Sequence, residues 1–334
     1  MPASIAVESS DPSEYEQAVL PAQMQVFATV RGPFEARIVG FTFDRVLGHR
    51  GYVSLPCVTH TALGSKRAAV FFLADAEQKP MFNSGREVCA EDMVLYARGS
   101  EHHNHALGAC HAASMSMLAQ DFAFYGQTLL GKELRAPETN QVVRPSAAAM
   151  SRLRSLHKAA GDLAVTAPDL LNHPEVSKAI EQELIHAMVG CLTESMPAGS
   201  ERNRSQSMAV MRRFARVLEE GEDSPFYLAE ICAAVGVSER SLRLHCAEHL
   251  GMSPHRYLWL RRMNLARRSL VVASPSARTV TEIATEQGFW ELGRFAGAYR
   301  QLFGETPSQT LRREYKGRMP AREHPLRSHL EASS

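Results

Sequence analysis

Side chains able to read nucleic-acid bases gather in one stretch of the C-terminal half, SERSLRLHCAEHLG, which starts at Ser238. If this stretch is helical, one face presents Arg240, Ser241 and Leu244, with Arg243 beside them. Arginine can bond a guanine edge through two parallel hydrogen bonds, and an apolar side chain can touch a thymine methyl group. The combination predicts base contacts in DNA, above all for Arg240. An ordinary solvated helix face is the alternative interpretation.

A second stretch, residues 288–307, presents glycine where the first presents side chains. It reads GFWELGRFAGAYRQLFGETP, and its corresponding face holds Gly293, Arg294, Gly297 and Arg300. Glycine carries no side chain for reading a base, but it lets a backbone approach closely. We therefore expect Arg294 and Arg300 to bind phosphates, and this stretch to anchor the protein on DNA with little sequence preference.

The two stretches belong to an internal repeat, which indicates how they are positioned. The repeat aligns Glu230 of EICAAVGVSERSLRLHCAEHLGMSP with Glu282 of EIATEQGFWELGRFAGAYRQLFGETP. The offset is 52 residues up to the turn glycines Gly236 and Gly288 and 53 from Leu242 onwards, so the second copy has one extra residue after its turn. Glycine can take the left-handed conformation that a sharp turn between helices requires. Each copy is therefore predicted to be a helix-turn-helix unit.

Apolar residues at every fourth position predict how the second helix of each unit packs. Ser238 is a good N-cap for the first of these helices. The spacing buries one side of each helix and leaves the predicted DNA-contacting side exposed. The apolar residues are Leu242, Cys246 and Leu250 in the first copy and Phe295, Tyr299 and Phe303 in the second.

A long helix is predicted between the two copies, in SPHRYLWLRRMNLARRSLVV, opening at Pro254, a residue tolerated in a first turn. About 18 residues at 1.5 Å each span roughly 27 Å, which suits a spacer between two helices that enter successive major grooves about 34 Å apart. Its predicted buried seam is Trp259, Met263, Ala266 and Leu270. Its arginines either face phosphates or form structural salt bridges: Arg261, Arg262, Arg267 and Arg268.

Residues 203–318 resemble the DNA-binding domain of the AraC/XylS family of bacterial transcription regulators. The resemblance rests on the paired units, on ARRSL near the end of the joining helix and on the closing GFWELGRFAGAYRQLFGETPSQTLRR. The overall arrangement is similar to regulators of the ethanolamine-operon type. The resemblance implies an N-terminal sensing or dimerisation domain, often a cupin-like barrel, and double-stranded DNA and RNA polymerase as partners.

Composition and charge are consistent with two domains. The chain has 334 residues, 45% of them apolar, which is ample for two packed cores. Residues 203–318 carry 18 Lys and Arg against 12 Asp and Glu, whereas residues 1–202 carry 17 against 22. The halves thus differ in sign, about +6 and −5, as expected when one domain binds nucleic acid and the other does not.

The N-terminal half is expected to be a mostly-β barrel or sandwich with trailing helices. Short strands broken by turn signals are predicted in ARIVGFTF, YVSLPCVTHTA, AAVFFLA, MVLYA and ASMSMLA. AAVFFLA is expected in the core, with the lining of a ligand pocket as the alternative. Helical spacing follows in 144–164 and 173–194, where a stripe should pack on the barrel or on a second subunit: Val176, Ile180, Leu184, Met188 and Cys191. The predicted divisions are a sensor domain at 1–195 (β-rich 22–125, helical 145–195), a linker at 196–207, the DNA-binding domain at 203–318 and a flexible tail at 319–334.

A histidine-rich segment, GSEHHNHALGACH at 99–111, could suggest a metal site. His103 and His105 would share one face of a strand, as ligation by both imidazoles requires. A cupin metal site also needs a glutamate shortly afterwards, and no Glu occurs between His105 and Gln120. We therefore predict a polar turn between strands with solvated histidines and no metal, leaving His103 and His105 as the metal candidates if this is wrong.

Together these features predict a sequence-specific DNA-binding transcription regulator, an activator and homodimer that responds to an effector on its N-terminal domain. No catalytic motif stands out, so neither an enzyme nor a cofactor is expected. Six scattered cysteines without CxxC spacing and the lack of a long apolar run favour a reduced, cytoplasmic protein without membrane contact.

Two other functions remain open. One is a cupin-type metal-binding sensor or enzyme joined to a DNA-binding domain, with His103 and His105 at its centre. The other is a regulator whose N-terminal domain binds only a protein partner. A cavity of at least roughly 300 Å³ in that domain would favour a small-molecule effector instead.

Overall fold

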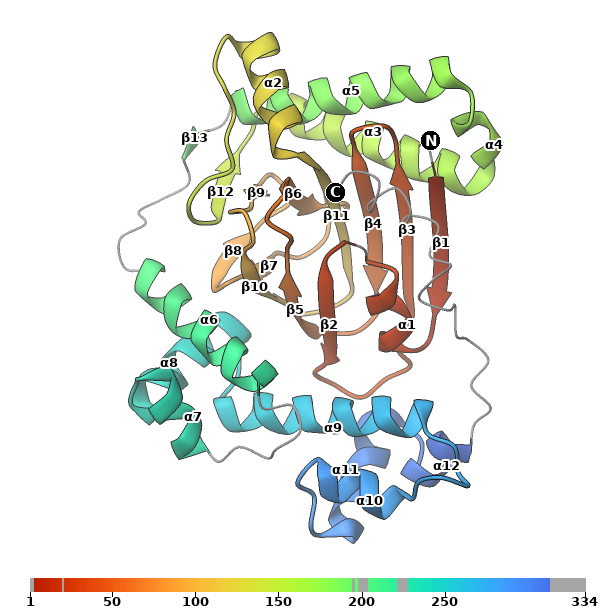
Figure 1. Ribbon diagram of the computed structural model, residues 1–334, viewed down its shortest axis with the longest axis vertical. Coiled ribbons are helices and arrows are strands. Elements are labelled where there is room, and N and C mark those ends of the chain that lie inside the picture. Colours follow the sequence, from red (N-terminus) through yellow and green to blue (C-terminus); the bar gives the residue numbers. More distant parts are fainter. Residues whose placement is uncertain (1–2, 20, 194–195, 198–203, 221–227, 313–334) are drawn as a thin grey trace.

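The chain folds into a β-rich N-terminal half and a helical C-terminal half, which lie against each other in the computed structural model (Figure 1). The structure describes residues 3–19, 21–193, 196–197, 204–220 and 228–312. No helix within these ranges is long and apolar enough to cross a bilayer. This division into a β-rich and a helical half confirms the predicted fold class.

The N-terminal half is built from two antiparallel sheets, ordered β1-β3-β4-β11-β6-β9-β12-β13 and β2-β5-β10-β7-β8. The strands of the first sheet are β1 (Ala3–Ser9), β3 (Ala36–Thr42), β4 (Leu47–Val53), β6 (Arg67–Leu73), β9 (Met93–Leu95), β11 (Cys110–Leu118), β12 (Gln141–Arg144) and β13 (Met196–Pro197). Those of the second sheet are β2 (Gln23–Ala28), β5 (Cys57–Ala62), β7 (Met81–Asn83), β8 (Arg86–Val88) and β10 (Glu101–Ala106).

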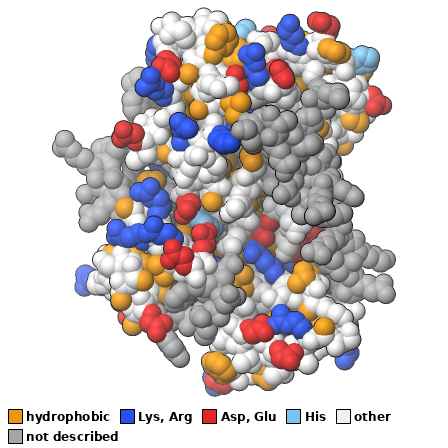
Figure 2. Space-filling model, in the orientation of Figure 1, with side chains coloured by type: hydrophobic (Ala, Val, Ile, Leu, Met, Phe, Trp, Pro, Cys, Tyr) orange, Lys and Arg blue, Asp and Glu red, His pale blue; other side chains and the backbone are white. Residues whose placement is uncertain are grey.

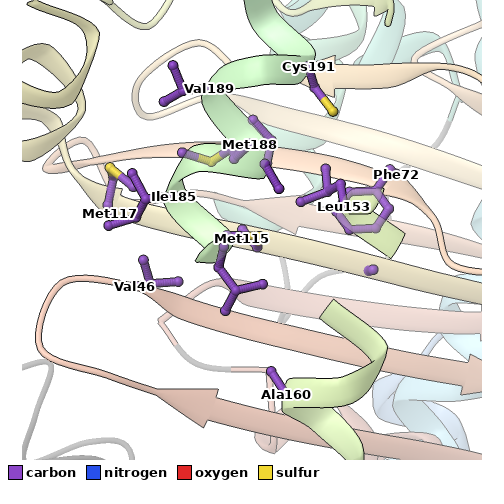
Figure 3. Packing of buried hydrophobic residues seen from close by; sticks show 14 of the residues in the cluster. Val46, Phe72, Met115, Met117, Leu153, Ala160, Ile185, Met188, Val189 and Cys191 are labelled. Carbon is purple, nitrogen blue, oxygen red and sulfur yellow. The ribbon is translucent and has the colours of Figure 1, made fainter. Parts of the chain in front are cut away.

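Helices cover the outer face of the first sheet, because alternate residues of its strands are apolar there. On β11, Ala113, Met115 and Met117 face α3 (Ala147–Thr166) and α5 (Pro174–Thr193) in one buried cluster (Figure 3). The other helices of this half are α1 (Pro12–Gln17), α2 (Ala119–Leu130) and α4 (Pro168–Leu171). Most of the predicted stripe on α5 is buried in that cluster, which confirms packing on the N-terminal sheet; Val176 at its start is 37% exposed.

The C-terminal half has two helical cores joined by one long helix. Its helices are α6 (Arg204–Glu220), α7 (Leu228–Val235), α8 (Glu239–Leu250), α9 (Pro254–Val272), α10 (Val280–Glu286), α11 (Leu292–Phe303) and α12 (Pro307–Arg312). Tyr257 at the start of α9 packs in the first core, whereas Leu260, Met263, Ala266 and Leu270 pack in the second. The predicted seam is thus buried apart from Trp259, which is half-buried. Since α9 belongs to both cores, it is a stiff connection.

Several predictions about the N-terminal half need correction. YVSLPCVTHTA is not one strand: β4 ends at Val53 and β5 begins at Cys57, with Pro56, which has no N–H for a ladder, between them. The histidine segment is not a solvated turn. It forms β10, and His102 and His103 are buried at 3% and 4% exposure.

Other elements lie at the edges of the predicted divisions. β1 and α1 precede the predicted β-rich range 22–125, and α2 begins inside it. β13 and the start of α6 lie within the predicted linker 196–207, while residues 198–203 and the predicted tail 319–334 lie outside the described residues.

Candidate DNA-binding site

The first predicted unit is formed by α7, a turn at Gly236 and α8. Gly236 has φ 75°, the left-handed conformation that glycine adopts without strain. Ser238 is the N-cap of α8, because its hydroxyl accepts a hydrogen bond from the backbone N–H of Ser241. Leu242 and Cys246 are fully buried beneath the helix. The cap and this apolar side fix which face of α8 points outwards.

The outward face of α8 carries the predicted base-reading residues. Arg240, Arg243 and Leu244 are exposed and Ser241 is half-buried. Leu244 is 64% exposed, an unusual position for a large apolar side chain and one available to a thymine methyl group. Arg243 pairs with Glu239 at 2.7 Å on the same surface, whereas Arg240 has no ion pair within the described residues. The guanidinium of Arg240 is therefore exposed without an ion-pair partner among the described residues, whereas that of Arg243 is paired.

The second unit repeats this geometry through α10, a turn at Gly288 and α11. Gly288 has φ 75°, like its counterpart in the first unit. Thr279 and Glu282 form a capping box at the start of α10. Phe295 and Tyr299 anchor α11 in the core, where the Tyr299 hydroxyl lies 2.8 Å from that of Thr310. The sequence repeat, with its 52-residue offset between the turn glycines, is thus also a structural repeat.

The outward face of α11 is open at both of its glycines. Gly293, Arg294, Gly297 and Arg300 are all exposed. A Cβ added to Gly293 or Gly297 would meet no atom within 4 Å, so packing within the protein does not require glycine at either position. Arg294 pairs with Glu291 at 3.0 Å, with both side chains largely in solvent. This surface therefore presents arginine side chains next to glycine backbone that no side chain covers.

Trp290, which the sequence analysis did not select, stands beside this face. It is 71% exposed and follows Phe289, which packs on Arg262 and Phe295. The sequence did contain a signal for the position of Trp290. The one extra residue after the second turn lengthens the loop that leads into α11.

Comparisons with known proteins agree with this arrangement. A family model described as a helix-turn-helix domain matches residues 231–313. The probable thc operon regulatory protein of Rhodococcus erythropolis is 36% identical over 140 residues, 42% of this chain and 42% of that protein. The XylDLEGF operon transcriptional activator 3 of Pseudomonas putida is 33% identical over 114 residues, 34% of either chain. The chain therefore spans less than half the length of these two curated relatives.

A solved structure has a similar level of identity. It is that of a probable AraC family transcriptional regulator from Rhodopseudomonas palustris, which is 33% identical over 30% of this chain and 94% of its own, with a TM-score of 0.27. The C-terminal part of the chain, residues 231–313, is a helix-turn-helix domain of the AraC/XylS type.

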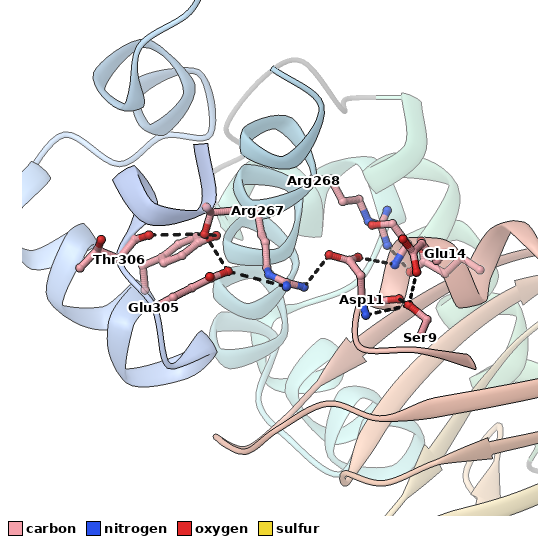
Figure 4. Close-up of polar contacts among 11 residues, drawn as sticks. Ser9, Asp11, Glu14, Arg267, Arg268, Glu305 and Thr306 are labelled. Carbon is pink, nitrogen blue, oxygen red and sulfur yellow. Dashed lines mark hydrogen bonds and ion pairs between the residues drawn. The ribbon is translucent and has the colours of Figure 1, made fainter. Parts of the chain in front are cut away.

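The joining helix of this AraC/XylS domain turns two of its arginines towards the N-terminal half. Arg267 lies 3.2 Å from Asp11 and Arg268 pairs with Glu16, so α9 is tied to both ends of α1 (Figure 4). Burial raises the pKa of the Glu16 carboxyl, and Arg268 opposes that rise. The salt-bridge alternative thus holds for Arg267 and Arg268.

The other two α9 arginines also have partners within the protein. The guanidinium of Arg262 lies 5.5 Å from the centre of the Phe289 ring, and Arg261 is buried at 6% exposure. On the side of the AraC/XylS domain seen in Figure 2, basic side chains lie among acidic ones. A uniform basic surface is therefore absent from this view.

The second sheet supplies the rest of the contact with the AraC/XylS domain. Phe27 of β2 and Val58 of β5 are fully buried in the core of the first helix-turn-helix unit. The Phe27 and Tyr257 rings meet edge to face with centroids 5.9 Å apart. Apolar side chains from both halves thus share one core, which holds the first unit against the sheet.

His103 and His105 lie on this contact surface. His103 lies 6.0 Å from the Tyr257 ring, and a Cβ on Gly251 would lie 2.1 Å from the His105 imidazole. Burial lowers the pKa of both imidazoles, so both are neutral at pH 7. Within the described residues no three His, Cys, Asp or Glu side chains lie close enough together to hold a metal ion. The two histidines pack against the DNA-binding half.

The N-terminal half also contains a cavity of about 320 Å³ on the inner face of the first sheet. Its wall includes residues of β4, β6 and β11, the turn between β5 and β6, and Val19, Pro21 and Ala22, which follow α1. The volume falls within the range of small-molecule sites.

Proposed function

We propose that this chain is a sequence-specific DNA-binding transcription regulator controlled by a small molecule bound in its N-terminal half. The observation that carries the proposal is the pair of recognition helices, α8 and α11, each with a buried apolar side, an exposed face and a position on the shared helix α9. The 19 residues of α9 span about 28 Å at 1.5 Å per residue, which suits two helices in successive major grooves.

In this proposal the two units divide the work of recognition. Arg240 bonds a guanine edge and Leu244 contacts a thymine methyl group, while Ser238, Ser241 and Arg243 position the N-terminal end of α8 in the groove. On α11, Arg294 and Arg300 bind phosphates, and Gly293 and Gly297 let the backbone approach them. Sequence preference then comes mainly from the first unit.

The cavity supports a small-molecule effector over regulation by a protein partner alone. The residues that follow α1 line this cavity, and α1 holds α9 through Asp11 and Glu16. A molecule in the cavity therefore contacts the residues directly after α1, the helix that is tied to α9. To act as an effector, the molecule must change how the C-terminal half is presented to DNA. It must therefore bind with different affinity to two arrangements of the halves.

The proposal includes a cytoplasmic activator that acts as a homodimer and contacts RNA polymerase. The metal-centred alternative has less support, because His103 and His105 pack against Tyr257 and Gly251. No observation favours it over a regulator without catalytic activity.

The test is selection of bound sequences from a random DNA library by the purified full chain at physiological salt, followed by mapping of bound sites in the genome. We expect one enriched motif with its strongest information in one major-groove segment. Binding that never exceeds the affinity for bulk DNA would overturn the proposal.

A further inference from the structure

The inner cavity exists because the strands that line it carry small residues there. On β11, Ser114, Met115 and Ser116 line the cavity, and Met115 also belongs with Met117 to the buried cluster beneath α3 and α5. On β6, Ala69 lines the cavity and lies opposite Ser116 in the sheet. Large side chains at Ser114, Ser116 and Ala69 would fill the space.

Most of the remaining wall is apolar. It includes Leu63, Leu118, Val19 and Ala22, and the ring of Tyr96. The Tyr96 hydroxyl accepts a hydrogen bond from Asn83, so the ring presents mainly its apolar surface. Such a wall favours a ligand with an apolar body, because its burial releases that surface from water.

One lysine and one arginine line this cavity: Lys66, which is exposed, and Arg67, whose hydrogen-bond partners are neutral. The Nε of Arg67 donates to the Ser116 hydroxyl at 3.0 Å, and its Nη2 donates to the carbonyls of Ser116 and Arg45 at 2.8 and 3.2 Å. No carboxylate lies within ion-pair distance of it in the described part of the chain; Asp121 acts on it only from farther away. Burial lowers the pKa of the guanidinium to about 10, so it is still charged at pH 7.

A charged group without an opposite charge in an apolar wall favours an anionic ligand. Removing an arginine from water is costly unless a counter-charge is close, and an arginine–carboxylate hydrogen bond is about twice as strong as a neutral one. The Ser116 hydroxyl accepts from Arg67, so its own hydrogen is available to a ligand oxygen.

We propose that this cavity binds a compact apolar molecule carrying a single carboxylate, and that Arg67 holds the carboxylate. The apolar body lies against Leu63, Leu118 and Tyr96, and Ala69 and Ser114 provide the room for it. The proposal specifies the class of ligand for the cavity named under the proposed function. It depends on that function only in assigning the bound molecule the role of an effector.

The test measures binding to the full chain without DNA, by titration calorimetry, with three acids and their primary amides. The pairs are cyclohexanecarboxylate, 1-naphthoate and nonanoate, each with its carboxamide, because acid and amide share one body and differ in charge. We expect at least one acid to bind at least tenfold more tightly than its amide. If no acid binds, or if each amide binds as well as its acid, the proposal is overturned.

Two variants assign the result to the cavity. Arg67→Met should weaken the acid at least tenfold and change amide binding less than threefold. Ala69→Leu, which leaves Arg67 intact, should abolish binding of both, and it keeps the test decisive if Arg67→Met does not fold. Arg37→Met is the control, since Arg37 is an arginine of the same sheet whose side chain is 66% exposed. An acid preference that survives Arg67→Met would also overturn the proposal.

The same preparation separates this inference from the proposed function. Acid binding with no sequence-specific DNA binding would overturn the proposed regulatory function and support the carboxylate site. Sequence-specific DNA binding with no acid binding would support the proposed regulatory function and overturn the carboxylate site.

Discussion

Arg267 Nη1 lies 3.2 Å from Asp11 Oδ2, and the two side chains are only 12% and 17% exposed. The pair joins α9, the helix between the two recognition units, to the N-cap of α1. At this N-cap, Asp11 also accepts a hydrogen bond from the backbone N–H of Ser13. An ion pair shielded from water is more strongly coupled than one at the surface, because removing one partner leaves a poorly solvated charge. The contact between the two halves is therefore sensitive to single charges.

A double-mutant cycle on this pair should measure that coupling. Asp11→Asn removes the charge but keeps an N-cap, and Arg267→Met removes the guanidinium but keeps an apolar stem. We expect a coupling free energy of unfolding of about 1–3 kcal/mol. The control is the pair Glu8 and Arg37, which has the same 3.2 Å separation but exposures of 76% and 66%. Its coupling should stay below about 1 kcal/mol. Equal couplings would mean that the contact does not hold the halves together.

His157 should make the stability of the N-terminal half depend on pH. It is fully buried between the Phe41 and Phe72 rings, and burial lowers its pKa from 6.5 to about 3. The neutral form is favoured in the folded state, so its stabilisation is complete above pH 6.5 and declines as the pH falls towards 3. Between pH 7 and pH 5 the loss is about 2 kcal/mol, because only the unfolded chain binds the proton.

The measurement is the free energy of unfolding at both pH values for the wild type and His157→Met. The variant should lose about 2 kcal/mol less on acidification. His186→Met is the control, because His186 lies exposed on α5. The interpretation fails if His157→Met and the wild type respond equally to pH.

The helix-turn-helix units could be predicted because their determinants are local. A turn glycine and apolar residues every four positions suffice to set the geometry of α7 with α8 and of α10 with α11, and both turn glycines have φ 75°. The repeat gave the same information twice. The alignment also placed Arg240 and Arg294 on exposed faces, where the structure has them.

The histidine segment could not be predicted because its environment is not local. In HHNH the side chains look suited to solvent, yet one face of β10 packs on Tyr96 and the other on the DNA-binding half. Only the docking of a domain more than a hundred residues away buries His103. The contact of Arg267 with Asp11 was hidden for the same reason, since spacing along α9 cannot reveal what lies opposite it.

The roles of Arg240 and Arg294 can be separated with two substitutions. Arg240→Ala should cost about 1–3 kcal/mol and relax preference at one base position, because it removes a base contact. Arg294→Ala should weaken binding to all sequences alike and reduce the salt slope by about 1, because it removes a phosphate contact. Affinities for the selected site, its single-base variants and bulk DNA at several salt concentrations test both. Equal, sequence-dependent losses for the two variants would reverse the proposed division of labour.

Gly297 provides a substitution that should raise stability while it lowers DNA affinity. Because a Cβ there meets no protein atom within 4 Å, Gly297→Ala should stabilise α11 by up to about 1 kcal/mol through helix propensity alone. If the glycine serves close approach to a phosphate, the same methyl group should lower the affinity for DNA several-fold, with little dependence on sequence. Gly190→Ala is the matched control, since Gly190 lies within α5 with the same open space around its Cα. It should raise stability and leave DNA binding unchanged. If Gly297→Ala binds DNA as tightly as the wild type, the close approach of α11 to the backbone is wrong, and Arg294 and Arg300 must hold the phosphates from farther away.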